Sequence, residues 1–182
     1  MERVNKENKE KIMGLIEKAG NVNNYETSWD EKGMPVSKSK IDIKRGKTSR
    51  AQGAKFELKV RKDLEEKGRF VDKWNNNVDF EKGEIVPAKR KYNPFMRAMV
   101  IGTGFPDFIS IKSVHEGLYS VIGVEVKLNG MLSKEEKEKC AFYLQKGVFS
   151  SIWIAKAVKT GKKIEIEYDD FKEKYGDKYN KP

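Results

Sequence analysis

Three residues carry the side chains best suited to chemistry, and their spacing can bring them together. Asp107 opens one short apolar segment, and Glu125, 18 positions later, closes another together with Lys127. Side chains on a strand alternate between its two faces, so Glu125 and Lys127 would project from the same face. Two carboxylates beside an ammonium group can hold a hard cation and activate a water molecule, which suits phosphodiester hydrolysis. The alternative is a hairpin whose Glu and Lys form a solvated ion pair.

The elements that must position these residues follow from the hydrophobic pattern. Two apolar strands are expected near residues 107–112 and 119–127. The loop between them, at 113–117, would hold His115 as an exposed turn residue. The strand–helix–strand run from 119 to 157 predicts a right-handed crossover between parallel strands.

A helix and two further strands follow the second acid. Ser133 and Glu136 form a capping-box pattern that begins a helix, which Gly147 ends after residue 146. A buried strand is expected at 148–157 and an edge strand at 163–168.

A second helix is expected upstream, from about Ala51 to Gly68. Glu57 lies on this helix, and two interpretations of it stand side by side. Glu57 points inward, where an acid must be paired or face a metal, or it is a surface residue that pairs with Arg61 at i+4. The apolar residues of this helix are Ala54, Phe56, Leu58, Val60 and Leu64.

The length of 182 residues allows one domain with extensions. Residues 5–18 have helical character, whereas 21–49 lack a sustained apolar period and are interpreted as a linker or basic arm. Residues 78–103 look like a loop-rich insertion with one or two short strands. The predicted division is an N-terminal helix with a basic arm at 1–50, a core at 51–168 and a C-terminal tail at 169–182, which is expected to be a short, partly frayed helix.

The charge favours a polyanionic partner, since 38 Lys and Arg stand against 28 Asp and Glu, a net charge of +10. A basic protein gains affinity for nucleic acid because each neutralised phosphate releases counterions. The basic residues cluster before the upstream helix and again before Asp107. The candidate phosphate contacts are Lys38, Lys40, Lys44, Arg45, Lys47, Arg50, Lys89, Arg90, Lys91 and Arg97.

The rest of the composition points to a reducing compartment. A single cysteine, Cys140, forms no internal disulfide and is expected to be a small core residue. No N-terminal apolar run resembles a signal peptide, and no apolar run reaches membrane-spanning length. The sequence therefore predicts a cytoplasmic protein without a membrane partner. The absence of a Cys/His cluster argues against a structural zinc.

The pattern Pro106-Asp107 followed by Glu125-x-Lys127 resembles the PD-(D/E)xK nuclease superfamily. The resemblance covers roughly residues 51–168. It implies an α/β fold with a restriction-endonuclease-like core, in which a central mixed β-sheet is flanked by helices. The first 50 residues would form a basic extension outside this core.

Two groups within the superfamily are similar to different parts of the chain. Gly104-Phe105-Pro106-Asp107, Glu125-Val126-Lys127 and the later Gly130, Leu132 and Ser133 resemble the VRR-NUC type of nuclease. That group usually has a glutamine early in the following helix, where this chain has Glu136. The segment Gly53-Ala54-Lys55-Phe56-Glu57-Leu58 resembles archaeal Holliday junction resolvases, although their insertion before the acid is shorter.

Either resemblance implies hydrolysis of DNA with one or two Mg²⁺ (or Mn²⁺) ions. Asp107, Glu125 and the backbone carbonyl of Val126 would bind the metal, and Glu57 would join through a bound water or a second site. Lys127 would orient or help deprotonate the attacking water and stabilise charge on the phosphorane. The resemblance thus implies Glu57, Asp107, Glu125 and Lys127 as catalytic residues.

Branched, flapped or junction DNA is the substrate class that these relatives imply, and resolving a junction would need two sites, hence a homodimer. Two other functions stay open. The chain can be a catalytically inactive nucleic-acid-binding module that keeps the nuclease fold, or a nuclease directed at RNA.

Overall fold

The computed structural model describes residues 6–93, 98–101, 104–161 and 163–179. The chain divides into two compact units, Met1–Gln52 and Gly53–Pro182, which are described separately. Helix α2, Lys40–Glu66, contributes its first part to one unit and the rest to the other.

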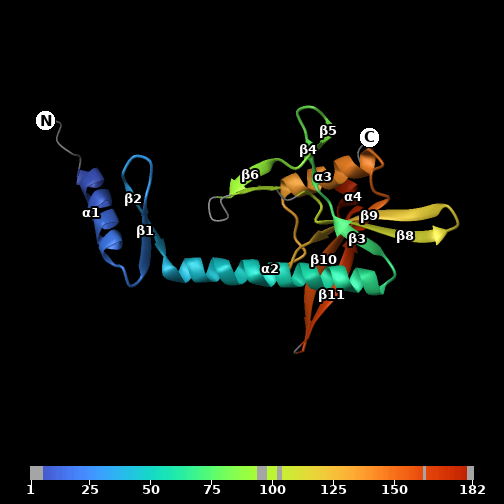
Figure 1. The fold of residues 1–182 in the computed structure, drawn as a ribbon, viewed down its shortest axis with the longest axis horizontal. Coiled ribbons are helices and arrows are strands. Elements are labelled where there is room, and N and C mark those ends of the chain that lie inside the picture. The colour runs from blue at the N-terminus through green and yellow to red at the C-terminus, as the bar shows by residue number, and fades with distance from the viewer. Residues whose placement is uncertain (1–5, 94–97, 102–103, 162, 180–182) are drawn as a thin grey trace. The chain divides into compact units, whose positions relative to one another are not determined.

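The first unit contains a helix and a β-hairpin, followed by the start of α2 (Figure 1). Residues 21–49, interpreted from the sequence as a linker or basic arm, thus contain a hairpin and the start of α2. The turn of the hairpin forms because the Asp30 carboxylate accepts hydrogen bonds from two backbone N–H groups, while Gly33 adopts a positive φ of 72°. The elements are α1, Lys6–Gly20, β1, Tyr25–Trp29, and β2, Pro35–Ser39.

Helix α2 begins at Lys40, eleven residues before the predicted start at Ala51. Its first part is exposed and polar, so no apolar period marks it. Its second part buries Phe56, Val60 and Leu64, which stand four residues apart on one side of the helix. The helix ends at Glu66, and Gly68 follows with a φ of 74°, as predicted for this end.

A five-stranded mixed sheet forms the centre of the second unit, in the order β11-β10-β9-β8-β3. Strands β9 and β10 are parallel and joined through helix α3, which confirms the predicted strand–helix–strand connection. The other neighbours are antiparallel. His115 is the last residue of β8 rather than a loop residue. The bounds are β3, Phe70–Lys73, β8, Phe108–His115, β9, Leu118–Val126, α3, Lys134–Gln145, β10, Ser151–Thr160, and β11, Lys163–Asp170.

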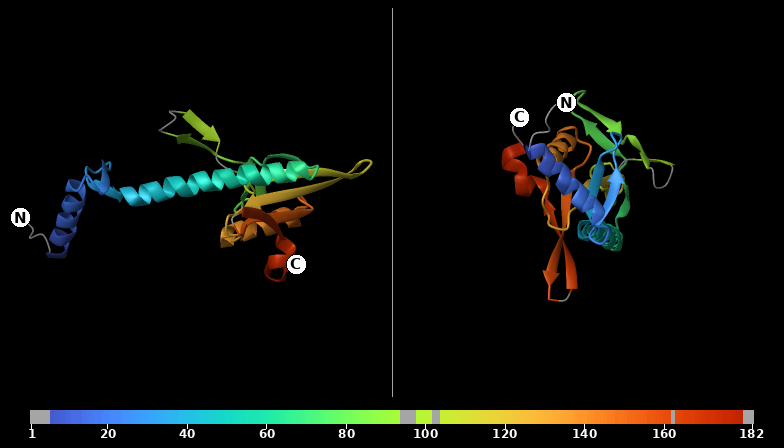
Figure 2. Two further views of the ribbon diagram at one scale, coloured as in Figure 1. Left: turned by 90° about the horizontal axis from the view of Figure 1, so that it is seen from below. Right: turned by 90° about the vertical axis from the view of Figure 1, so that its left-hand side faces the viewer.

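Helices cover both faces of this sheet, so the predicted α/β class is confirmed. Figure 2 shows α2 on one side of the sheet and α3 with α4 on the other. Phe108, Val124 and Ala155 pack with the α2 residues, whereas Ile152 and Ile154 pack with α3 and α4. Alternation along β10 explains this division, since neighbouring residues of a strand face opposite sides.

The C-terminal segment belongs to this core. Helix α4, Phe171–Tyr179, follows β11 directly, and its Phe171 is fully buried. Tyr175 and Tyr179 pack against the Phe171 ring. The helix expected after Asp169 is therefore present at Phe171–Tyr179, and it packs on the core instead of fraying.

The insertion between β3 and β8 holds more strands than the one or two predicted. Four strands pair as two antiparallel hairpins. They are β4, Asn76–Asp79, β5, Glu84–Pro87, β6, Arg90–Asn93, and β7, Ala98–Ile101. Among the residues that the structure describes, no helix is long and apolar enough to cross a membrane.

Candidate active site

Two glycines allow the segment before β8 to place Asp107 against the sheet. A Cβ atom on Gly104 would lie 1.9 Å from the Trp74 carbonyl oxygen. A Cβ atom on Gly123 of β9 would lie 2.8 Å from the Pro106 ring. Both distances are too short for any side chain, so glycine is required where the Pro106-Asp107 segment crosses its neighbours.

Asp107 and Glu125 are joined by reciprocal hydrogen bonds between their elements. The Asp107 backbone N–H donates to Glu125 Oε2 at 3.1 Å. The backbone N–H of Val126 in turn donates to Asp107 Oδ2 at 2.9 Å. Each acid thus fixes the backbone that carries the other, and the two carboxyl groups that the sequence singled out lie side by side.

Lys127 lies between two carboxylates. Its Nζ atom is 2.9 Å from Glu125 Oε1 and 2.7 Å from Glu136 Oε1. The Glu125 residue is only 4% exposed, so the solvated Glu–Lys pair considered as an alternative does not describe this arrangement. The strand spacing that put Glu125 and Lys127 on one face therefore predicted the geometry correctly.

Glu136 caps helix α3 and also contacts Lys127. Its Oε2 atom accepts a hydrogen bond from the Ser133 backbone N–H at 2.7 Å, and the Ser133 hydroxyl accepts one from the Glu136 backbone N–H. This is the predicted capping box at the start of α3. The other oxygen, Oε1, binds Lys127, which the sequence did not show.

Glu57 pairs with a residue that the sequence did not suggest. Its Oε2 atom is 2.7 Å from Lys73 Nζ, so the proposed pair with Arg61 is wrong. Arg61 instead binds Glu65 one turn further along α2. Glu57 is partly exposed, and its charge contributes to raising the pKa of Asp107. It therefore lies near the acid pair without being buried in it.

Burial raises the pKa of both central acids. For Glu125, desolvation and the nearby Asp107 carboxylate raise the pKa to about 8, against the opposing effect of Lys127. For Asp107, desolvation is again the main cause of a raised pKa, opposed by the Val126 hydrogen bond. Although burial acts in the opposite direction, Glu125 and Glu136 raise the pKa of Lys127, so the lysine stays charged.

The donor set fits a hard divalent cation. Four carboxylates, Glu57, Asp107, Glu125 and Glu136, share two ammonium groups, Lys73 and Lys127. A buried site with excess negative charge and oxygen donors suits Mg²⁺ or Mn²⁺.

Within the described ranges, however, no three His, Cys, Asp or Glu side chains converge as a ready-made ion site. Lys73 pairs with Glu57, and Lys127 pairs with Glu136. Asp107 and Glu125 would therefore need main-chain or water oxygens to complete a coordination shell. The backbone carbonyl of Val126 is the candidate from the sequence.

The basic residues predicted to contact phosphate are exposed wherever the structure describes them. Lys89 and Arg90 are exposed in the second unit. Lys91 lies in β6 with its side chain outside the described part, and Arg97 lies outside the described residues altogether. The exposed residues of the first unit are Lys38, Lys40, Lys44, Arg45, Lys47 and Arg50.

Comparison with known proteins adds no relative. No family model matches the chain, and neither a curated protein nor a solved structure is significantly similar to it.

Proposed function

We propose that this chain is a metal-dependent nuclease that hydrolyses DNA phosphodiester bonds. The observation that carries the proposal is the pair formed by half-buried Asp107 and buried Glu125, with Lys127 2.9 Å from the second acid. Burying two carboxylates together is costly unless a cation compensates them. Lys127 is shared with Glu136 and offsets this charge only in part.

The surrounding elements support the same proposal. Helix α2, strands β8 and β9, helix α3 and the parallel strand β10 follow one another in the order that the PD-(D/E)xK resemblance implies. On this basis the five-stranded sheet is a restriction-endonuclease-like core. The net charge of +10 agrees with a nucleic-acid substrate.

Asp107, Glu125 and the backbone carbonyl of Val126 would hold Mg²⁺ or Mn²⁺. When bound there, the ion would supply positive charge to the scissile phosphate and to the attacking water. Lys127, kept protonated between two glutamates, would orient that water and stabilise the negative charge that develops on the phosphorane. Glu136 would hold Lys127 in place. DNA with branches or flaps is the substrate class that we propose from the resemblance.

Cleavage assays with isosteric variants test this function. Asp107→Asn and Glu125→Gln keep hydrogen-bond acceptors for the backbone N–H groups that these side chains bind. We expect each to lower Mg²⁺-dependent cleavage of flapped DNA at least about 100-fold, because each removes charge that acts on the transition state. Glu116→Gln, in the exposed turn before β9, is the matched control and should cut at the wild-type rate.

The same assay separates the competing functions. Full activity of Asp107→Asn would remove Asp107 from the site. A wild-type protein that binds all substrates and cuts none, in Mg²⁺ or Mn²⁺, would be a binding module on a nuclease fold. Faster cleavage of an RNA flap than of the matched DNA flap would make it a ribonuclease.

A further inference from the structure

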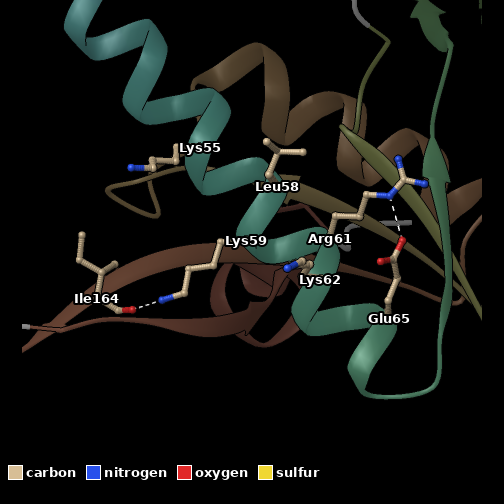
Figure 3. Close-up of a pocket in the computed structure, with 7 residues that line it drawn as sticks. All are labelled: Lys55, Leu58, Lys59, Arg61, Lys62, Glu65 and Ile164. Atoms are coloured by element: carbon tan, nitrogen blue, oxygen red, sulfur yellow. Dashed lines mark hydrogen bonds and ion pairs between the residues drawn. The ribbon is translucent and has the colours of Figure 1, made fainter.

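A groove runs over the outer face of α2 to the edge strand β11, and no residue of the candidate active site lines it. In Figure 3, Lys55 and Lys59 lie on the side of Ile164 of β11, whereas Arg61 and Glu65 lie on the other side of the helix. The volume of the groove is about 910 Å³. The lining residues of this α2–β11 groove are Lys55, Leu58, Lys59, Arg61, Lys62, Glu65 and Ile164.

Three lysines of the groove project away from Glu57. Lys55, Lys59 and Lys62 follow one another at i, i+4 and i+7, so they share a face of the helix. At 3.6 residues per turn, this face lies about 140–160° around the helix axis from Glu57. Glu57 itself turns to Lys73 of β3. A phosphate held by these three lysines would therefore lie on a different face of α2 from one beside Glu57.

The groove carries more positive charge than its own acids compensate. Glu65 is its single acid, and it pairs with Arg61 at 2.9 Å. The ammonium group of Lys59 donates to the backbone carbonyl of Ile164 rather than to a carboxylate. Among the described residues, no acid lies within ion-pair distance of Lys55 or Lys62. Three ammonium groups thus stand without an acidic partner.

Apolar side chains accompany these charges. Leu58 is 66% exposed and Ile164 is 53% exposed. Further acids border the groove on one side. Asp63, Glu66 and Glu165 line an adjoining hollow together with Lys59 and Lys62. The face suited to an anion is therefore the side of Lys55 and Leu58.

We propose that the α2–β11 groove binds the sugar–phosphate backbone of a nucleic-acid segment other than the one being cut. Lysines would contact phosphates while Leu58 and Ile164 contact the apolar faces of the sugars. Lys55 and Lys62 are about 10 Å apart along the helix axis, which corresponds to about three nucleotides of one duplex strand.

This inference rests on the proposed function and narrows its substrate. The three lysines and Glu57 project from nearly opposite faces of α2. A flapped or branched substrate can offer a separate arm to each face, so the groove would favour flapped or branched DNA over linear duplex.

The test measures how salt weakens DNA binding, in EDTA so that no cutting occurs. The probes are a fluorescein-labelled flapped duplex and a linear duplex of equal length. The triple variant Lys55→Ala, Lys59→Ala and Lys62→Ala is compared with wild type. If all three lysines contact phosphates, the slope of log affinity against log salt should become shallower by about 2 to 3 for the flapped probe. A smaller change is expected for the linear probe.

A control variant removes the same charge elsewhere on the second unit. Lys82, Lys172 and Lys178 are exposed, and their triple replacement by alanine should leave the slope of the flapped probe unchanged. An unchanged slope in the groove variant would overturn the proposal. So would a groove variant that binds DNA normally but loses a dimer in size-exclusion chromatography, because the groove would then be an interface between copies.

The outcome separates this proposal from the nuclease proposal. The salt slope of DNA binding can become shallower in the groove variant while the wild-type protein cuts no substrate. This result would support the groove proposal and refute the nuclease proposal. The groove variant can instead cut flapped and linear DNA at wild-type rates and show an unchanged salt slope. This result would support the nuclease proposal and refute the groove proposal.

Discussion

Replacing Glu125 by glutamine should stabilise the metal-free protein at neutral pH. Glu125 is buried beside Asp107, and this environment raises its pKa from 4.5 to about 8. The folded state therefore binds a proton more tightly than the unfolded state does. Above pH 4.5 the unfolded chain releases this proton and the folded chain keeps it, so stability falls as pH rises, until the folded pKa is passed.

The size of the effect follows from the pKa. Each pKa unit corresponds to about 1.4 kcal/mol, so ionisation of Glu125 costs the folded state about 3 kcal/mol at pH 7. Glutamine carries no charge and keeps an oxygen to accept the Asp107 N–H. The Glu125→Gln variant should thus gain about 3 kcal/mol in the free energy of unfolding at pH 7, and less than about 0.5 kcal/mol at pH 4.5. In a domain of this size, that gain raises Tm by roughly 6–12 °C.

Urea unfolding of both proteins at pH 4.5, 6, 7 and 8 in EDTA measures this difference. The gap should widen steadily with pH up to about pH 8. Saturating Mg²⁺ should then stabilise wild type more than the variant, because a ligand stabilises the state that binds it. A variant that is less stable than wild type by the same amount at every pH would refute the reasoning, since Glu125 would then be a purely structural hydrogen-bonding group.

Three further predictions concern the residues around this pair. Glu136→Gln should keep the α3 cap but slow cleavage, because it removes the charge beside Lys127. The control Ser133→Ala should lower the free energy of unfolding by about 1 kcal/mol and leave the cleavage rate unchanged. Equal cleavage rates in both variants would argue against a role for Glu136. Gly104→Ala should unfold the segment before Asp107, because its Cβ atom would clash with the Trp74 carbonyl oxygen. The control Gly53→Ala, whose Cβ atom would contact no other atom, should have the wild-type Tm. A fully stable Gly104→Ala protein would contradict this packing. Glu57→Ala should change the free energy of unfolding by less than about 1 kcal/mol, because the ion pair of Glu57 with Lys73 is partly exposed. The same variant should slow cleavage less than Asp107→Asn does. A wild-type cleavage rate in Glu57→Ala would show that Glu57 only forms a surface ion pair and takes no part in cleavage.

The sequence predicted the central sheet because each of its strands is marked by apolar residues. Strands β8, β9 and β11 lie within a few residues of their predicted positions, and the capping box located the start of α3. Strands β8 and β9 and helix α3 have buried residues, and β11 has half-buried ones, so tertiary packing and the local pattern agree.

The first unit could not be predicted in this way. None of its described side chains is fully buried, so its hairpin leaves no apolar alternation to read. Thr27 and Ser37 form its central cross-strand contact, hydroxyl to hydroxyl at 2.8 Å. A turn signal at Asp30 to Gly33 was present, but turn residues alone do not distinguish a hairpin from a linker.

The candidate site was predicted in its centre and missed at its edge. Alternation on one strand placed Glu125 beside Lys127, since the two residues are close in the chain. Lys73 is 16 positions from Glu57, and no local period connects them. Their pairing depends on how β3 docks against α2, which is a property of the tertiary fold.

The central claim is that Asp107 and Glu125 together hold a divalent ion. Crystals soaked in Mn²⁺ and measured at a wavelength where manganese scatters anomalously test it directly. We expect an anomalous peak between the two carboxyl groups, at about 2.0–2.3 Å from an oxygen of each, and its loss in Asp107→Asn crystals. A wild-type crystal without such a peak, or with the manganese elsewhere, would contradict the claim.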